Sequence, residues 1–314
     1  MISVVIPTFQ RAWALSYSLE SLSKQSRPPD EVIIVLKPSR DGSENVIQNF
    51  SKKLPIKTVI QKSGFVAQAA ELGLKNALGD KILFMDDDCV ADADFCRIYE
   101  EFFDQYEDAG ALTGVIFTAH LKNGQLIKTQ ERFTPLNVAR SVLYRKPLKI
   151  FRGYTEWISK SGLTTTTVVP NKNIVHSAAL CGANMGFKRI AINKCPLNEL
   201  YNRSRKGFNY ESVLAFWVRT KGFHTYKCIN PAFAPIVWHL SHERHITKRN
   251  NFYDEFWFSY DVFSNYFRYK KLRADVALIS WVLACITISR KQIPAKVAAL
   301  LYTIMTELKT DFKN

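Results

Sequence analysis

Three consecutive aspartates, Asp86, Asp87 and Asp88, directly follow the apolar run from Ile82 to Met85. So short an apolar run, closed by acids, is typical of a buried parallel strand. Adjacent carboxylates repel one another, so holding three of them together is costly unless a cation lies among them. Carboxylate oxygens suit Mg²⁺ or Mn²⁺ bound with a phosphorylated ligand, and open α/β sheets bind ligands at the carboxyl ends of their strands. The pattern favours a divalent-metal site over its alternative, a solvated acidic turn.

A fourth acid, Glu211, lies within the apolar and aromatic segment from Phe208 to Trp217. A carboxylate in such surroundings is either a buried structural acid or a base whose pKa is raised by burial. Asp254 and Glu255 form an alternative pair of acids, although their setting is that of ordinary acids on a helix surface. Both interpretations of Glu211 stay open on this pattern alone.

The elements that would position these acids alternate along the first part of the chain. Apolar runs predict strands over residues 3–6, 31–36, 56–60 and 81–85, and a strong helical pattern covers residues 67–77. Strands that alternate with helices at this spacing predict βαβ units and a parallel sheet.

The net charge of +15 is unevenly distributed over the 314 residues. Residues 1–119 carry 12 Lys or Arg and 17 Asp or Glu, whereas residues 120–314 carry 31 and 11. A basic half beside an acidic one suits a polyanionic or membrane-bound partner such as a lipid phosphate. Nucleic acid is not the expected partner, because no helix-turn-helix, zinc-finger or RNP-type pattern is present. The six cysteines form no CxxC pair and the N-terminus lacks a signal pattern, so we expect a cytoplasmic protein.

Taken together, the motifs resemble those of family 2 glycosyltransferases of the GT-A fold. The opening Ser3–Thr8, the Asp41-Gly42-Ser43 turn, Gly73 ahead of Ala77–Asp80, and Ile82–Asp88 follow the family's order and rough spacing. Later, Cys181–Arg189 looks like the family's acceptor-side segment, and Asn209–Ser212 resembles its Glu-Asp motif before a helix.

The resemblance implies an α/β protein of the GT-A fold, with a mostly parallel central sheet flanked by helices. The glycosyltransferase domain would cover residues 1–245, with a donor and metal half over 1–119 and an acceptor half over 120–245. Residues 246–314 would form a basic, helical C-terminal extension.

The resemblance also implies roles for individual residues. Asp86 and Asp88 correspond to the acids of the DxD motif, which bind Mn²⁺ or Mg²⁺ and the donor. Asp87 would help to bind the donor, or would only be structural. Glu211 takes the place of the catalytic base, which makes it the best candidate for that role. Pro7 and Thr8 would line the nucleotide.

Histidines concentrate in one heptapeptide, where His239, His242 and His245 recur at intervals of three. A helix would place them near one face. Because GT-A enzymes sometimes use a C-terminal histidine, one of them would join the metal, and we favour His239, which follows an apolar segment. A solvated basic loop is the alternative.

Two departures from the family's pattern concern the nucleotide base. The second strand commonly ends in Asp-Asp or Asp-Asn in the family, whereas Leu36 and Lys37 stand here. The Arg-Asn pair often found ahead of the family's glycine is replaced by Ala70-Glu71. Lys37 would reach a phosphate or a base carbonyl, or would simply be exposed, and we do not assume a uridine nucleotide.

These features predict a metal-dependent, inverting glycosyltransferase that moves a sugar from a nucleotide-sugar donor to a hydroxyl or lipid-phosphate acceptor. One alternative is a nucleotidyltransferase, which would usually carry a glycine-rich phosphate loop after the first strand. The segment from Pro7 to Arg11 contains no glycine. The other alternative is a catalytically silent relative that binds sugar or lipid.

The C-terminal tail carries two apolar segments, Val276–Ile288 and Val297–Met305, among basic residues. Neither is long enough to span a membrane. The plain interpretation is that both pack onto the protein's own core. The alternative is a pair of interfacial helices on an anionic membrane, which would make the protein peripheral on the cytoplasmic face.

Overall fold

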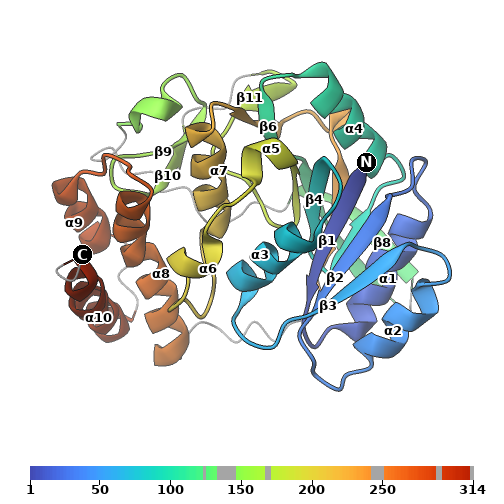
Figure 1. Ribbon diagram of the computed structural model, residues 1–314, viewed down its shortest axis with the longest axis horizontal. Helices are drawn as coiled ribbons and strands as arrows, with labels where there is room; N and C mark the ends of the chain where they lie inside the picture. Colours follow the sequence, from blue (N-terminus) through green and yellow to red (C-terminus); the bar gives the residue numbers. More distant parts are fainter. Residues whose placement is uncertain (123–124, 133–145, 167–170, 242–250, 288–291, 312–314) are drawn as a thin grey trace.

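The computed structural model describes residues 1–122, 125–132, 146–166, 171–241, 251–287 and 292–311. A central eight-stranded sheet has the strand order β11-β13-β6-β12-β4-β1-β2-β3, and helices cover both of its faces (Figure 1). The strands of this sheet are β1 (Ile2–Thr8), β2 (Glu31–Leu36), β3 (Ile56–Ile60), β4 (Lys81–Met85), β6 (Ala109–Thr113), β11 (Ile174–His176), β12 (Asn184–Lys188) and β13 (His224–Cys228).

The sheet is parallel in four of its seven strand pairings, namely β1–β2, β1–β4, β2–β3 and β6–β13. The prediction of strands alternating with helices is confirmed for the first half of the chain. The antiparallel pairings involve β11 and β12. Because β12 inserts between β4 and β6, the glycine-containing segment that precedes it lies beside the carboxyl end of β4.

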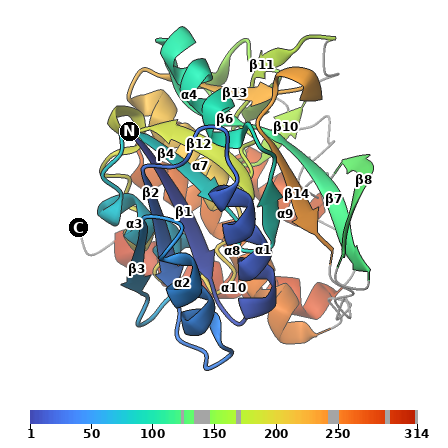
Figure 2. The ribbon, with the colours of Figure 1, turned by 90° about the vertical axis from the view of Figure 1, so that its right-hand side faces the viewer.

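The central strands are buried on both faces, which is why they appear in the sequence as continuous apolar runs. Successive side chains alternate between two cores. Val5 and Ile33 pack in one core with α3 (Val66–Asn76) and α7 (Tyr210–Thr220). Val4 and Val32 pack in the other with helices on the opposite face of the sheet (Figure 2). Those helices are α1 (Ala12–Ser23), α2 (Ser43–Phe50) and α4 (Phe95–Gln105).

A four-stranded sheet of order β5-β14-β7-β8 stands beside the end of β4. Its first strand, β5, begins directly after the three aspartates, and β14 pairs with it in antiparallel fashion. The bounds of these strands are β5 (Cys89–Ala91), β7 (Val115–Lys122), β8 (Gln125–Arg132) and β14 (Ile236–Leu240). The remaining small elements are η2 (Lys149–Phe151), β9 (Glu156–Ile158), β10 (Thr164–Thr166), α5 (Arg189–Ile192), α6 (Leu197–Leu200) and η3 (Pro231–Phe233).

Three helices end the described chain, α8 (Phe252–Lys271), α9 (Leu278–Thr287) and α10 (Ile293–Asp311), on the left in Figure 1. They share an aromatic core that includes Tyr260, Phe263 and Trp281. Over the residues described, we find no helix that combines the length and the apolar character needed to cross a membrane.

Candidate active site

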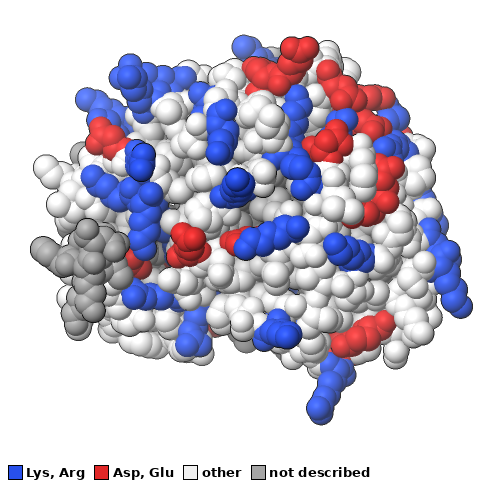
Figure 3. Space-filling view, viewed as in Figure 1, with Lys and Arg blue, Asp and Glu red and all other residues white. Residues whose placement is uncertain are grey.

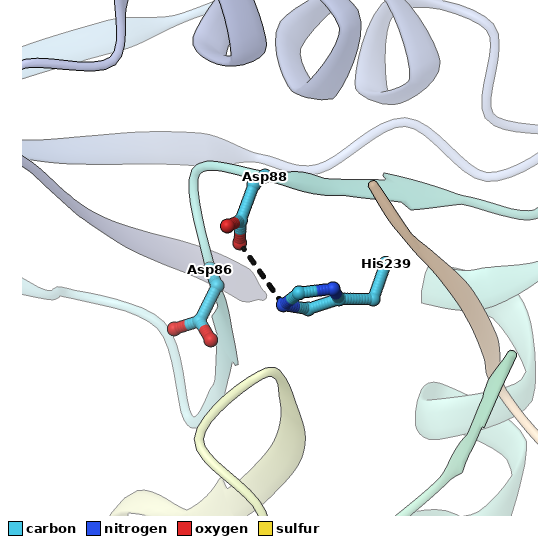
Figure 4. A group of neighbouring side chains, drawn as sticks. All are labelled: Asp86, Asp88 and His239. Atoms are coloured by element: carbon cyan, nitrogen blue, oxygen red, sulfur yellow. Dashed lines mark ion pairs between the residues drawn. The ribbon is translucent and has the colours of Figure 1, made fainter. Parts of the chain in front are cut away.

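The predicted metal ligands Asp86, Asp88 and His239 come together at the carboxyl end of β4. One ligand atom from each lies within 4.8 Å of the others, and His239 Nε2 is 3.5 Å from Asp88 Oδ1. In Figure 4 both carboxylates lie beside the imidazole ring. The backbone explains this arrangement, because β14 pairs with β5 so that His239 stands opposite Cys89, next to Asp88.

The helical interpretation of the histidine repeat is wrong for His239. His239 lies on strand β14, whose parallel partner is β7. The segment from Ile236 to Leu240 is extended because it pairs with β5 on one side and with β7 on the other. His242 and His245 lie outside the described residues.

The side chains of Asp86, Asp88 and His239 fit a divalent cation. Two carboxylates and one imidazole supply oxygen and nitrogen ligands of the kind that Mn²⁺ accepts, and Mg²⁺ suits the carboxylates. Burial raises the pKa of Asp86 to about 8, and the charges of Asp88 and Asp87 act in the same direction. A cation among these oxygens would favour the ionised form and relieve the repulsion.

Asp87 points to a different set of partners. Its Oδ2 accepts a hydrogen bond from Thr8 Oγ1 at 2.7 Å, and its Oδ1 accepts one from Arg11 Nη1 at 2.9 Å. Burial raises the pKa of Asp87 to about 6, while Arg11 acts in the opposite direction. These contacts favour the structural role that the sequence left open for Asp87.

Arg11 is the residue that the sequence analysis missed. The same Nη1 also donates to Asp88 Oδ2 at 2.5 Å, so one guanidinium joins two of the three aspartates. Its signal in the sequence was weak, since it is one arginine in the loop after the first strand. Only the pairing of β1 with β4 brings this loop against the acids.

Glu211 lies in the first turn of α7, close to the metal group. Burial raises its pKa to about 7, although the backbone N–H groups of Glu211 and Gly182 favour the charged form. The charge of Glu211 also raises the pKa of Asp86, so the two side chains are close enough to interact electrostatically. A carboxylate with a pKa near 7 suits proton transfer at neutral pH.

The backbone around Glu211 leaves little room for substitution. Asn209, the residue before the helix, has a left-handed φ of 70°. A Cβ added at Gly182 would lie 2.7 Å from the hydroxyl of Tyr210 and 3.2 Å from Glu211 Oε1. Gly182 is therefore the residue that allows the turn before β12 to approach Glu211.

At the carboxyl ends of β1 and β2, Lys37 lies between two aromatic rings. Its Nζ is 5.1 Å from the centre of Phe9 and 5.0 Å from that of Phe65, and it donates to the Gly64 carbonyl at 2.9 Å. The Lys37 N–H also bonds the Thr8 carbonyl, which continues the β1–β2 ladder. Pro7 is half-buried on β1. These residues line the end of β1 and β2, near the aspartates but not among the metal ligands.

Ala70-Glu71, which replaces the family's Arg-Asn pair, has a structural explanation in Glu71. Glu71 pairs with Lys75 and accepts a hydrogen bond from the Asn198 backbone, so it ties α3 to α6. Gly73, two residues further along α3, serves packing instead. A Cβ there would lie 2.2 Å from Val5 Cγ1, so its role is the close approach of α3 to β1.

The alternative acids Asp254 and Glu255 lie in the first turn of α8 and have other partners. Asp254 pairs with Lys206 at 2.5 Å, and Glu255 pairs with Lys296 at 3.4 Å. Both carboxylates thus have basic partners at a helix N-terminus, which favours a structural role for them.

The family model described as "Glycosyl transferase family 2" matches residues 3–162, half of the chain. The chain belongs to this family. The match covers β1 to β4 and the three aspartates, and it favours a sugar transferase over a nucleotidyltransferase.

Two curated relatives illustrate the similarity. The uncharacterized glycosyltransferase YwdF of Bacillus subtilis is 39% identical over 90 residues, which is 28% of this chain and 32% of the relative. The poly(ribitol-phosphate) β-N-acetylglucosaminyltransferase TarS of Staphylococcus aureus is 26% identical over 156 residues, 48% of this chain and 27% of TarS. The matched segments thus span about a third or less of these relatives.

Solved structures confirm the GT-A fold. The crystal structure of S. aureus TarS 1-349 in complex with UDP-GlcNAc superposes with a TM-score of 0.56 at 15% identity, covering 98% of this chain and 81% of that one. A structure of GalNAc-T7 with UDP, GalNAc and Mn²⁺ gives a TM-score of 0.54 at 12% identity, over 78% of this chain and 44% of that one.

Proposed function

We propose that this protein is a metal-dependent, inverting glycosyltransferase with Glu211 as the general base. The observation that supports this best is that Glu211 acts electrostatically on Asp86, whose carboxylate lies with Asp88 and His239 in the candidate metal group. A base with a pKa of about 7 thus stands beside a group that can hold Mn²⁺ or Mg²⁺. The solved complexes of TarS with UDP-GlcNAc and of GalNAc-T7 with UDP, GalNAc and Mn²⁺ support a nucleotide-sugar donor and a divalent ion here.

The proposed reaction is a single displacement at the anomeric carbon. Glu211 takes the proton of the acceptor hydroxyl, whose oxygen forms a bond to the anomeric carbon while the bond to the donor's diphosphate breaks. A lipid phosphate that is already ionised would attack without this proton transfer. A divalent ion held by Asp86, Asp88 and His239 would supply the charge that stabilises the leaving diphosphate. Pro7, Thr8 and Lys37 would line the nucleotide, with Asp87 holding Thr8 in place.

Under this proposal residues 1–245 form the transferase domain and residues 246–314 its helical extension. Asp261 of α8 accepts hydrogen bonds from Ser204 Oγ and from the Phe208 N–H, three residues before Glu211. The extension thereby supports the acceptor side of the site.

Donor choice is the direct test of the proposed function. Because Lys37 presents an ammonium between Phe9 and Phe65 where the family has acids, we expect no strict preference for uridine. Thermal unfolding with Mn²⁺ and either UDP or GDP should show stabilisation by at least one of them, following RT ln(1 + [L]/Kd).

A second assay distinguishes a working enzyme from a silent relative that only binds. It measures the release of sugar from the nucleotide-sugar that corresponds to the stabilising nucleotide. A variant of exposed Lys62, Lys62→Met, is the control for Lys37→Met, which should change the ratio of the UDP and GDP affinities. A clean preference for UDP over GDP by calorimetry, unchanged in Lys37→Met, would show that other residues bind the base.

We further propose that α9 and α10 bind an anionic membrane and bring the site to a lipid-linked acceptor. Both helices bury one side in the aromatic core but expose large apolar side chains on the other, with Ile279 77% and Met305 60% exposed. Spacings of three and four residues place those of α10 on one face. The exposed set is Leu278, Ile279, Val282, Leu283, Ile293, Val297, Leu301, Met305 and Leu308.

Charge supports an anionic surface as the partner of this apolar face. Lys270, Lys271 and Arg273, at the end of α8, are exposed. Figure 3 shows the face of the molecule seen in Figure 1. Acidic side chains gather at its upper right, around α4, whereas basic side chains predominate on its left-hand side, towards α8 to α10. Each basic residue near an anionic bilayer contributes on the order of 1 kcal/mol.

Flotation with vesicles tests this proposal. The protein should float with anionic vesicles at low salt, detach as salt screens the charges, and stay unbound with neutral vesicles. The double substitution Leu301→Gln with Met305→Gln should abolish flotation, whereas Ile190→Gln, at a site 70% exposed on α5, should not. Absence of flotation at low salt, or flotation that survives deletion of residues 270–314, would contradict the proposal.

A further inference from the structure

Arg11 places a permanent positive charge against the aspartate cluster. Its Nη1 contacts Asp87 Oδ1 at 2.9 Å and Asp88 Oδ2 at 2.5 Å, and its side chain is 31% exposed. An arginine guanidinium does not lose its proton in proteins. This guanidinium therefore stays charged at any pH at which the protein is folded.

Asp88 is shared between Arg11 and the candidate metal group. Its Oδ2 is bonded to Arg11, while its Oδ1 lies 3.5 Å from His239 Nε2, on the side of the metal group. A divalent cation at that group would lie a few ångströms from the guanidinium, and like charges at such a distance repel strongly in a buried setting. Arg11 and the cation would thus compete for the same carboxylate while repelling each other.

The charge balance indicates what Arg11 does when no cation is bound. Arg11 places one positive charge against the three crowded aspartate carboxyl groups and contacts two of them, Asp87 and Asp88. The Arg11 carbonyl accepts hydrogen bonds from the N–H groups of Ala14 and Leu15, so its backbone is fixed at the start of α1. When a cation binds nearby, only the side chain of Arg11 is therefore free to move away from it.

We propose, on the basis of the metal group in the proposed function, that Arg11 is an internal counter-cation of this site. It stabilises the aspartate cluster in the metal-free protein and weakens the affinity of the site for a divalent cation alone. The cation then binds tightly only when a donor diphosphate adds its negative oxygens. Arg11 is a positioning residue, since it acts through Asp87 and Asp88.

The experiment compares Arg11→Gln, which removes the charge, with Arg11→Lys, which keeps it. Arg27→Gln is the matched control, because Arg27 is 26% exposed and also joins two acids, Asp30 and Glu100, remote from the metal group. Mn²⁺ binding without nucleotide is measured from the electron paramagnetic resonance signal of free Mn²⁺, and thermal unfolding is recorded with and without Mn²⁺.

We expect Arg11→Gln to bind Mn²⁺ about tenfold or more tightly than the parent protein, because a repelling charge has been removed. Its melting temperature should be lowered without metal and should approach that of the parent protein with Mn²⁺. Arg11→Lys should bind Mn²⁺ within about twofold of the parent protein, because lysine keeps the positive charge and its ammonium can still donate to the carboxylates. Arg27→Gln should lose stability equally with and without Mn²⁺.

The inference is overturned if Arg11→Gln binds Mn²⁺ no more tightly than the parent protein, or if Mn²⁺ leaves its stability deficit unchanged. A Gln variant that stays unfolded in the presence of Mn²⁺ also contradicts it, because the role of Arg11 would then be purely structural. If neither the parent protein nor any variant binds Mn²⁺, with UDP or GDP present or absent, the proposed metal group itself is wrong.

Discussion

Replacing Glu211 by glutamine is expected to lower kcat about a hundredfold or more, the range typical of removing a general base. The carboxamide keeps the shape of the side chain and can still accept from the Gly182 N–H, so donor binding should be unchanged. Single-turnover transfer assays and calorimetry of donor binding measure the two effects separately.

The pH dependence gives this prediction a second readout. Burial raises the pKa of Glu211 to about 7, and a base works only when unprotonated, so kcat of the parent protein should rise with pH through about 7. A raised pKa in the folded state also means that stability from this group is lost as pH rises through that value. The Gln variant should therefore lack the rise in kcat, and it should be no less stable than the parent protein above pH 7.

Asp254→Asn is the matched control for this experiment. Asp254 is also an acid in the first turn of a helix, but it pairs with Lys206 at 2.5 Å. We expect this variant to keep kcat within about twofold of the parent value, since surface ion pairs are worth little. Near-normal turnover by Glu211→Gln, with a large loss in Asp254→Asn or in Glu255→Gln, would move the base to α8.

The parts of the fold that could be predicted are those with strong local signals. Buried parallel strands carry continuous apolar runs, so β1, β2 and β4 could be located from sequence, and the aspartates at the end of β4 could be linked to a site. The antiparallel insertion of β12 between β4 and β6 could not be predicted, because pairing order depends on contacts far apart in the chain.

The same limit explains what was missed in the site. His239 was predicted to join the metal, and the structure places it beside Asp88 without testing that role. Its spacing of three residues from His242 suggested a helix, whereas His239 lies on a strand. Arg11 had no signal of its own until β1 and β4 were paired. Residues that act through long-range pairing leave no periodicity, so only the three-dimensional structure identifies them.

Substituting Asp88 by asparagine should abolish metal-dependent donor binding while leaving the fold intact. Asp88 faces His239 through Oδ1 and Arg11 through Oδ2, so it connects the metal group to the rest of the cluster. An amide is a weaker ligand for a hard cation than a carboxylate, and it removes one of the charges that attract the ion. Because loss of even an outer-shell partner weakens metal binding by about 10- to 100-fold, loss of this ligand should exceed that.

Thermal unfolding with Mn²⁺ and the stabilising nucleotide measures the effect. A ligand at about 100 times its Kd stabilises the parent protein by about 2.7 kcal/mol, and this gain should vanish in Asp88→Asn. The matched control is Asp92→Asn, which removes an exposed carboxylate just after β5 whose partner is Lys128. The carboxamide oxygen of the Asp88→Asn variant can still accept from Arg11, so circular dichroism and the metal-free melting curve should stay close to those of the parent protein. Unchanged nucleotide affinity of Asp88→Asn in Mn²⁺ would remove Asp88 from the metal group and, with it, the reason to place the donor's diphosphate at the end of β4.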